Sequence, residues 1–238
     1  MTVTVARVSG PLVSWGEDAK FRHRGTAPSP THSALTGLLA AAAGIGRGEP
    51  WPSWVSDAPQ AVRMDRPGSV LRDFHTINPA PTGKYRQLSK RDRSKVVTLA
   101  TAEGAARKDP LVTERFYRQD AEAVVFFDDP QGLVEACLAA PRWAIYGGRK
   151  GAALSFPLLL GRWSCGVEEA LTQVPSPAPA GAPLAAQTFF EPQTHPTLRT
   201  EERLDVWDGA EHRPGRRWHI EVDPPRMDGW FDLKEDGR

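Results

Sequence analysis

The sequence predicts an α+β fold built on a ferredoxin-like βαββαβ unit. Three observations lead to this prediction: an apolar strand near the N-terminus, an amphipathic helix after it, and a later group of strands that ends in a second helix. The chain has 238 residues, of which 40% are hydrophobic and 25% are charged. This composition is typical of globular domains, and the length allows one large domain or two small ones.

The first strand and the first helix carry the clearest local signals. Residues 3–8 form an apolar strand pattern that breaks at residues 10–16. Thr31 suits the N-cap of the helix, and Gly44 suits its C-terminal stop. Apolar side chains recur between them at helical spacing, at Leu35, Leu38, Leu39 and Ala42. A helix with such a stripe needs a sheet to cover.

The remaining elements of the unit follow along the chain. We expect strands at residues 61–64, 70–77, 111–118 and 123–127, and a short helix at residues 131–139. A glycine-rich loop at residues 146–151 carries two adjacent cations, Arg149 and Lys150. Together with the first strand and helix, these elements give the βαββαβ order.

Composition divides the chain into three parts. We expect residues 1–174 to form the main domain, residues 175–183 to form a Pro/Ala-rich linker, and residues 184–238 to form a less regular, β-rich segment that packs on the main domain. Within the main domain, residues 78–112 form a long polar excursion that is rich in Lys and Arg. An excursion of this length inside a compact domain usually carries function.

The net charge of +1 hides an uneven distribution. Residues 61–118 contain thirteen Lys and Arg against six Asp and Glu, a net charge of +7. Residues 167–238 contain eight Lys and Arg against fourteen Asp and Glu, a net charge of −6. A basic middle and an acidic end suit a protein that holds a polyanion on one face and another partner elsewhere. The alternative is a solvated surface with chance clustering.

Two residue types indicate the expected compartment. The chain has two cysteines, Cys137 and Cys165, and neither has a His or Cys at ligand spacing, so we expect no zinc site and two reduced thiols. No stretch approaches the roughly 18 apolar residues of a membrane span, and the N-terminus lacks a signal-peptide pattern. We therefore expect a cytoplasmic protein with no membrane partner, no metal and no cofactor.

The junction between the first strand and the first helix is a candidate anion site. It brings Trp15, Arg22 and Arg24 close in sequence to the helix start at residues 30–33. The amides of a first helical turn are unpaired and carry partial positive charge, so a phosphate group is a natural ligand there. The alternative is an ordinary strand-loop-helix unit.

Five short motifs occur in the order that is typical of one protein family. They lie at residues 10–16, at residues 30–33 leading into residues 37–42, and at residues 72–76, 114–117 and 148–150. With these motifs the chain resembles the CasD-type RAMP subunits of type I-E CRISPR Cascade complexes over most of residues 1–165. Two positions depart from the family pattern. His32 replaces a usual Lys or Arg, and residues 151–153 replace a run resembling Ser-Cys-Pro.

The resemblance implies a ferredoxin-like, RRM-like RAMP palm with a protruding basic thumb at about residues 78–112. Such a subunit holds the 5′ handle of the CRISPR RNA (crRNA) and caps the assembly. It contacts the backbone, large and processing subunits of Cascade and meets target DNA through the complex. The resemblance implies no catalytic residues.

The candidate RNA-binding residues follow from the motifs and from the chemistry of single-stranded RNA. Such RNA needs cations for its phosphates, flat side chains for stacking and polar groups for its base edges. The candidates are Ser14, Trp15, Arg22, Arg24, Thr31, His32, Ser33, Arg72, His75, Lys84, Tyr85, Arg86, Arg115, Tyr117, Arg149 and Lys150.

Several candidates also have a purely structural explanation. Trp15 and Phe116 are equally well explained as core aromatics, and Arg72 could pair with Asp73 or Glu114. His75 could be a hydrogen-bonded core histidine. We assign Arg149 and Lys150 to phosphate most directly, because a glycine loop exposes both.

Two function classes fit these residues. The first is a non-catalytic RNA-binding subunit, which the resemblance favours. The second is a metal-independent endoribonuclease that processes precursor crRNA, in which His75 or Tyr85 would act as the base and Lys84 as the cation at the scissile phosphate. A basic ribosomal or RNA-modification accessory module would explain the charge but not the five ordered motifs.

Overall fold

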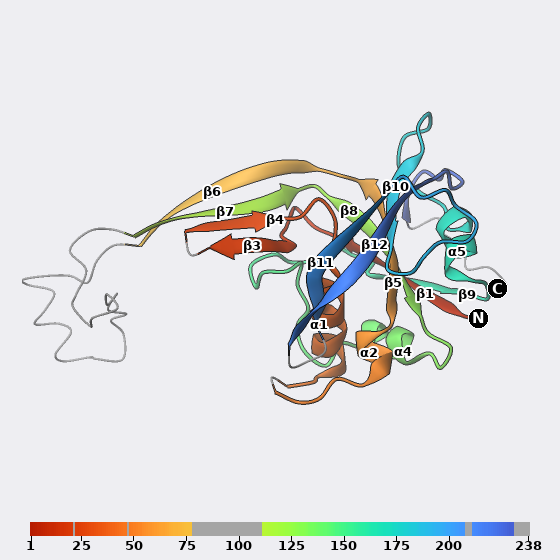
Figure 1. Ribbon diagram of the computed structural model, residues 1–238, viewed down its shortest axis with the longest axis horizontal. Coiled ribbons are helices and arrows are strands. Elements are labelled where there is room, and N and C mark those ends of the chain that lie inside the picture. Colours follow the sequence, from red (N-terminus) through yellow and green to blue (C-terminus); the bar gives the residue numbers. More distant parts are fainter. Residues whose placement is uncertain (21, 47, 78–110, 208–210, 231–238) are drawn as a thin grey trace, which may run out of the picture.

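The computed structural model describes residues 1–20, 22–46, 48–77, 111–207 and 211–230. It confirms a mixed α+β fold, with two β-sheets and short helices. Figure 1 shows a body that contains the helices and an arm of long strands that projects from it. No helix among these residues is both long enough and apolar enough to span a membrane.

A seven-stranded sheet forms the body. Its order is β11 (Arg199–Trp207), β12 (His212–Val222), β10 (Leu184–Thr188), β5 (Pro59–Arg66), β8 (Glu122–Asp128), β1 (Val3–Ser9) and β9 (Leu159–Trp163). All neighbouring strands pair antiparallel. The predicted strands at residues 3–8, 61–64 and 123–127 are confirmed as β1, β5 and β8, while β9 had no counterpart in the prediction.

Helices cover both faces of this sheet because its central strands are apolar on both sides. On one face, α1 (His32–Ala43), α2 (Ser53–Ser56) and α4 (Leu133–Ala139) pack with Val125 and Phe127. On the other face, α5 (Val167–Gln173) packs with Val124 and Phe126. Alternate residues of β8 thus enter two separate cores, as the two-residue period of a strand requires.

Helix α1 has the ends that the sequence predicts. The Thr31 hydroxyl accepts a hydrogen bond from the Ala34 backbone N–H at 3.2 Å, so Thr31 is the N-cap. Gly44 adopts the left-handed conformation, with φ of 74°, and its N–H points back to the carbonyls of the last turn. The predicted start and stop of α1 are confirmed.

A second sheet forms the arm, and its position corrects the prediction. It contains β2 (Leu12–Val13), β3 (Gly16–Lys20), β4 (His23–Thr26), β6 (Ser69–Ile77) and β7 (Leu111–Gln119). The strands expected at residues 70–77 and 111–118 were assigned to the main unit, but they pair with each other outside the seven-stranded sheet. Val70 and Phe74 remain 58% and 57% exposed, because one face of β6 has no layer over it. Most of the expected excursion, residues 78–110, lies outside the described residues.

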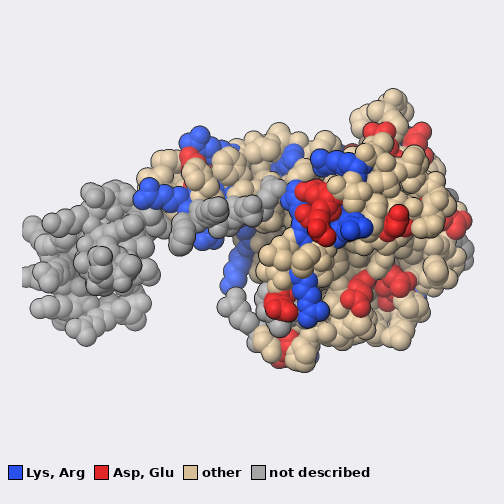
Figure 2. Space-filling model, in the orientation of Figure 1, with Lys and Arg blue, Asp and Glu red and all other residues tan. Residues whose placement is uncertain are grey.

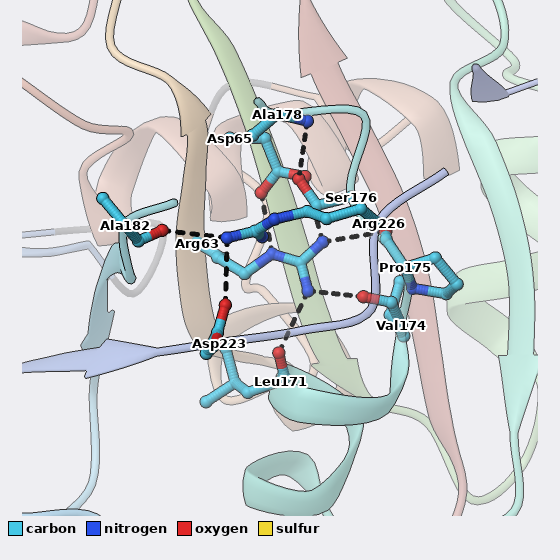
Figure 3. A network of polar contacts seen from close by, with 10 residues as sticks. All are labelled: Arg63, Asp65, Leu171, Val174, Pro175, Ser176, Ala178, Ala182, Asp223 and Arg226. Carbon is cyan, nitrogen blue, oxygen red and sulfur yellow. Dashed lines mark hydrogen bonds and ion pairs between the residues drawn. The ribbon is translucent and has the colours of Figure 1, made fainter. Parts of the chain in front are cut away.

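The segment after α5 is tied closely to the body. Ser176 is fully buried, and residues 184–188 form β10, which pairs with β5 and β12 in the main sheet. The buried Arg63 side chain reaches this segment (Figure 3): its guanidinium donates to the carbonyls of Leu171, Val174 and Pro175 at 3.0, 2.6 and 3.0 Å. The Pro/Ala-rich stretch at residues 175–183 therefore contacts the sheet at its first residues.

Asp65 provides the counter-charge for Arg63. Its carboxylate accepts hydrogen bonds from the guanidinium at 2.7 and 3.0 Å, and both side chains are inaccessible to solvent. A buried cation of this kind is tolerated only when its donors all find acceptors. Arg63 therefore connects β5, the end of α5 and the following segment.

Candidate nucleic-acid interface

The glycine loop packs against the chain segment that follows β2. Gly148 has a φ of 86°, and a Cβ atom on it would lie 1.7 Å from the Ser14 carbonyl oxygen. The Ser14 N–H donates to the Gly147 carbonyl at 2.9 Å. Only glycine permits this approach and this conformation, which bring the following residue, Arg149, beside the arm.

Arg149 joins a set of cationic and aromatic side chains on one side of the arm. The register places Arg24 of β4 beside Arg115 of β7, and Tyr117 lies two residues further along β7 on the same side. The Arg149 guanidinium carbon is 4.4 Å from the centre of the Tyr117 ring, and its Nη2 donates to the Arg24 carbonyl at 3.1 Å. Loop and arm therefore present one continuous surface.

His75 belongs to the same side of the arm. Asp73 of β6 lies opposite Arg115, and His75 follows two residues later. The His75 Nε2 atom forms a hydrogen bond with the Asp73 carboxylate, and 39% of the His75 side chain is exposed. The core-histidine explanation of His75 is therefore wrong. We call this side, with Arg24, Asp73, His75, Arg115, Tyr117 and Arg149, the arm face.

Arg72 projects from the opposite side of the arm. Its guanidinium lies 2.5 Å from the Glu114 carboxylate, which also accepts from His23 Nδ1 at 2.7 Å. The structural alternative for Arg72, a pair with Glu114, is confirmed. Its side chain is still 59% exposed, but it does not share a surface with Arg115.

Three guanidinium groups of the arm and the glycine loop have buried nitrogen atoms without acceptors among the described residues, and that of Arg118 lies on the side of the arm opposite Arg115. Buried nitrogen atoms of Arg115 (Nε), Arg118 (Nε) and Arg149 (Nη1) have no hydrogen-bond partner within the part of the chain that the structure describes. An external anion would meet the accessible part of each guanidinium group and not these buried atoms, which need acceptors from water or from the chain itself. A phosphate oxygen is a strong acceptor for the accessible N–H groups of a guanidinium. Figure 2 shows Lys and Arg side chains gathered over the arm.

A groove lies beside the first turn of α1. It has a volume of about 630 Å³, and its lining includes Ser14, Thr31, Ser33, Tyr146 and Gly148. Hydroxyl groups and the free N–H groups of the first helical turn supply donors, and the helix dipole adds partial positive charge. We call it the α1 groove. It brings together three sequence-predicted residues, Ser14, Thr31 and Ser33. Ser14 and Thr31 are only 2% and 3% exposed, and their hydroxyls bond to the Phe116 carbonyl and the Ala34 N–H, so Ser33 is the predicted residue left with an accessible side chain.

Two predicted RNA contacts are corrected by their burial. Trp15 is 1% exposed and packs with Val13, Ala27 and Ala121, so it is a core residue and cannot stack on a base. His32 is 6% exposed and meets the Phe189 ring edge-on, with 5.0 Å between ring centres. Neither side chain reaches the groove surface, because elements from distant parts of the sequence cover both.

The remaining candidates have mixed positions. Arg22 is exposed near the tip of the β3–β4 hairpin, where its carbonyl accepts from the Glu114 N–H at 2.7 Å, and Lys150 is exposed in the glycine loop. Lys84, Tyr85 and Arg86 lie outside the described residues. Sequence reasoning missed Tyr146, which lines the α1 groove. Its position directly before the glycine pair was the available signal.

Burial of His32 predicts a pH dependence of stability. Burial, helped by the charge of Arg217, outweighs Asp57 and lowers the pKa of His32 from 6.5 to about 4. Below pH 6.5 the unfolded chain therefore binds a proton that the folded chain does not. The stability of the folded protein is therefore unaffected by this group above pH 6.5. It falls as the pH is lowered from 6.5 toward 4, by up to about 3 kcal/mol.

Urea unfolding between pH 7 and 5 checks this expectation. The His32→Gln variant should lose much of the decline that the parent protein shows in this window. Glu168 does not confound the comparison, since its pKa is lowered to about 2 and its contribution is lost only below pH 4.5. Identical pH profiles for the two proteins would contradict the burial of a neutral His32.

Comparison with known proteins identifies the family. The sequence matches the family described as CRISPR-associated protein (Cas_Cas5) over residues 4–226. The chain belongs to this Cas5 family. The match includes both the arm and the main sheet as far as the end of β12.

Relatives of known name and structure agree with this assignment. The CRISPR system Cascade subunit CasD of Escherichia coli (strain K12) is 31% identical over 173 residues, which are 66% of this chain and 69% of that protein. A chain of a CRISPR RNA-guided surveillance complex superposes with a TM-score of 0.73 at 28% identity, covering 97% of both chains. A crystal structure of a Cas protein gives 0.62 at 25% identity, covering 95% of this chain and all of the other. The predicted resemblance to CasD-type subunits is confirmed.

Proposed function

We propose that this Cas5-family protein is a non-catalytic RNA-binding subunit of a type I-E CRISPR surveillance complex. In this proposal it acts in the cytoplasm and holds the 5′ handle of crRNA on the arm face and in the α1 groove. The observation that carries the proposal is the half-buried group of Arg115, Tyr117 and Arg149, which strand register and loop packing bring together on one side of the arm beside the exposed Arg24. An RNA backbone would supply acceptors for these guanidinium groups.

The two surfaces suit different parts of an RNA strand. The arm face offers guanidinium groups for phosphates and the Tyr117 ring, which Arg149 already covers on one side. The α1 groove offers hydroxyl and N–H donors, with Tyr146 at its wall. A single strand that crosses from one to the other would place its backbone on the cations and its bases in the groove.

The topology supports the palm and thumb of this proposal. Four adjacent strands, β5, β8, β1 and β9, with α1 after β1 and α4 after β8, have the order of a ferredoxin-like unit. We assign this unit as the palm. Strands β6 and β7 would form the base of a thumb that includes residues 78–112. The thumb and palm would contact the backbone, large and processing subunits, and target DNA would be met through the complex.

Direct RNA binding tests the proposal. The purified protein should bind an RNA that carries the 5′ repeat-derived handle more tightly than a scrambled RNA of equal length. The affinity should fall steeply between 50 and 200 mM salt, by roughly 100-fold or more if six phosphates are neutralised. A flat salt dependence, or equal affinity for both RNAs, would contradict handle binding.

A metal-independent endoribonuclease is the second candidate. The observation that favours it is the hydrogen bond between His75 and Asp73, which lies beside Arg115 and could orient the imidazole as a general base. We expect no cleavage of precursor RNA by this protein alone. Cleavage at the handle boundary that is abolished by a 2′-deoxy substitution and by His75→Ala would establish the nuclease instead.

A further inference from the structure

A second hollow lies at the end of the main sheet that is remote from the arm. It has a volume of about 760 Å³ and is lined at the start of β5, the end of β8, the first turns of α5 and the loop at residues 190–195. Val167 and Phe190 give it an apolar lining. In Figure 1, α5 and the N-terminus lie at the opposite end of the molecule from the arm. We call this hollow the α5 hollow.

Hydrogen bonds to Glu168 hold one wall of the α5 hollow in place. Its carboxylate accepts from the backbone N–H groups of Gln193 and Thr194 at 2.8 and 2.7 Å, and also from the Thr194 hydroxyl and His195. Partial burial alone would raise the pKa of Glu168, but these hydrogen bonds outweigh it and lower the pKa to about 2. The loop is therefore tied to α5, and the hollow is formed before any partner arrives.

The charge around the α5 hollow selects its occupant. Asp128, Glu168 and Glu169 line it, and no Lys or Arg is among its lining residues in the described ranges, so that Met1, with its α-amino group, and His195 are the lining residues that could carry positive charge. Asp128 and Glu169 are exposed at the rim. A phosphate backbone would be repelled there, while a cationic side chain beside an apolar one would meet both a carboxylate and an apolar surface.

We propose that the α5 hollow is a docking site for a basic, amphipathic segment of another protein. An apolar side chain of that segment would fill the space beside Val167 and Phe190, and a Lys or Arg would pair with Asp128 or Glu169. Because the arm face lies at the other end of the molecule, the protein can hold RNA and this partner together. The existence of the docking site does not rest on the proposed function. The identification of the partner as a subunit of the same complex does rest on it.

Charge reversal at the rim tests the docking site. The full chain is co-expressed with the other protein subunits of its complex and with guide RNA, and a tag on this chain captures what assembles. Asp128→Lys combined with Glu169→Lys should reduce the captured partner protein by at least about tenfold. The control variant, Glu202→Lys combined with Glu221→Lys, makes the same charge change at two exposed residues elsewhere and should assemble normally. Thr172→Trp, which fills the hollow without a charge change, should act like the rim variant.

Handle-RNA affinity of each isolated protein separates the possible outcomes. The rim variant should bind RNA as the charge-matched control variant does, and Thr172→Trp should bind RNA as the parent protein does. Normal capture of partner proteins by both the rim variant and Thr172→Trp overturns the docking site. Weaker RNA binding by Thr172→Trp, or tighter RNA binding by the rim variant than by the charge-matched control, would make RNA the occupant. A parent dimer that the rim variant dissociates would make it a second copy. Either result overturns the proposal. Failure of the parent protein to bind RNA rejects the proposed function alone, since partner capture is measured separately.

Discussion

Replacing Arg115 and Arg149 together with alanine should weaken binding of 5′-handle RNA by at least about 100-fold, because each charge-assisted hydrogen bond contributes roughly 1.5–3 kcal/mol. Strand register and loop packing hold both guanidinium groups on the arm face, so they are positioned for an anion before it binds. Arg149 loses its contact with Tyr117 in the same variant, which removes a cation from the face of that ring. The loss should exceed that of either single variant.

An equal change of net charge elsewhere is the matched control. Arg142→Ala combined with Arg199→Ala removes two exposed cations from outside the arm face and should change the affinity only slightly at moderate salt. Fluorescence anisotropy with labelled handle RNA measures both variants, and circular dichroism shows that each remains folded. Similar losses in the two double variants would mean that binding depends on overall charge and not on the arm face.

Replacing Arg63 with methionine should destabilise the protein by about 3–5 kcal/mol, the usual cost of breaking a buried ion pair by removing one partner. The variant leaves the Asp65 carboxylate buried without its cation. It also leaves the carbonyls of Leu171, Val174 and Pro175 without the guanidinium that donates hydrogen bonds to them. The attachment of residues 174–176 to the main sheet should loosen first.

Denaturant unfolding measures this effect, with Arg226→Ala as the comparison. Arg226 is drawn in the same network in Figure 3, but it bonds to the Ala182 carbonyl and to the exposed Asp223, so its loss should cost no more than about 1 kcal/mol. A similar small loss in Arg63→Met would show that water or rearranged backbone replaces the guanidinium. Protease cleavage near residues 175–183 should rise in Arg63→Met alone.

Local signals explain which elements the sequence predicts well. The N-cap hydroxyl of Thr31 and the left-handed Gly44 act within a few residues of α1, so their effect is readable from the chain itself. Strands β1 and β8 are also predictable, because both of their faces are buried and their residues are almost continuously apolar. The concentration of cations between residues 61 and 118 is likewise a property of the sequence, although eight of the thirteen lie outside the described residues.

Non-local packing explains the residues whose roles were misjudged. Trp15 and Ala121 are far apart in the chain but share one small core, so the same aromatic residue that suggests stacking is buried. His32 is covered by Phe189 and lies near Arg217, which come from the C-terminal part that sequence motifs did not identify. In contrast, His75 lies on an uncovered strand, and its exposure depends on the sheet that β6 joins.

The sequence by itself determined the α+β class, the caps of α1, the central strands and the family, because these depend on short-range periodicity, capping chemistry and ordered motifs. Only the tertiary structure decided which cations share a surface. Arg72 and Arg115 lie on neighbouring strands of one sheet, yet strand register sends them to opposite sides, whereas Arg149 reaches the side of Arg115 from a distant loop. Register and loop packing are set by contacts between residues far apart in the chain, and no local pattern encodes them.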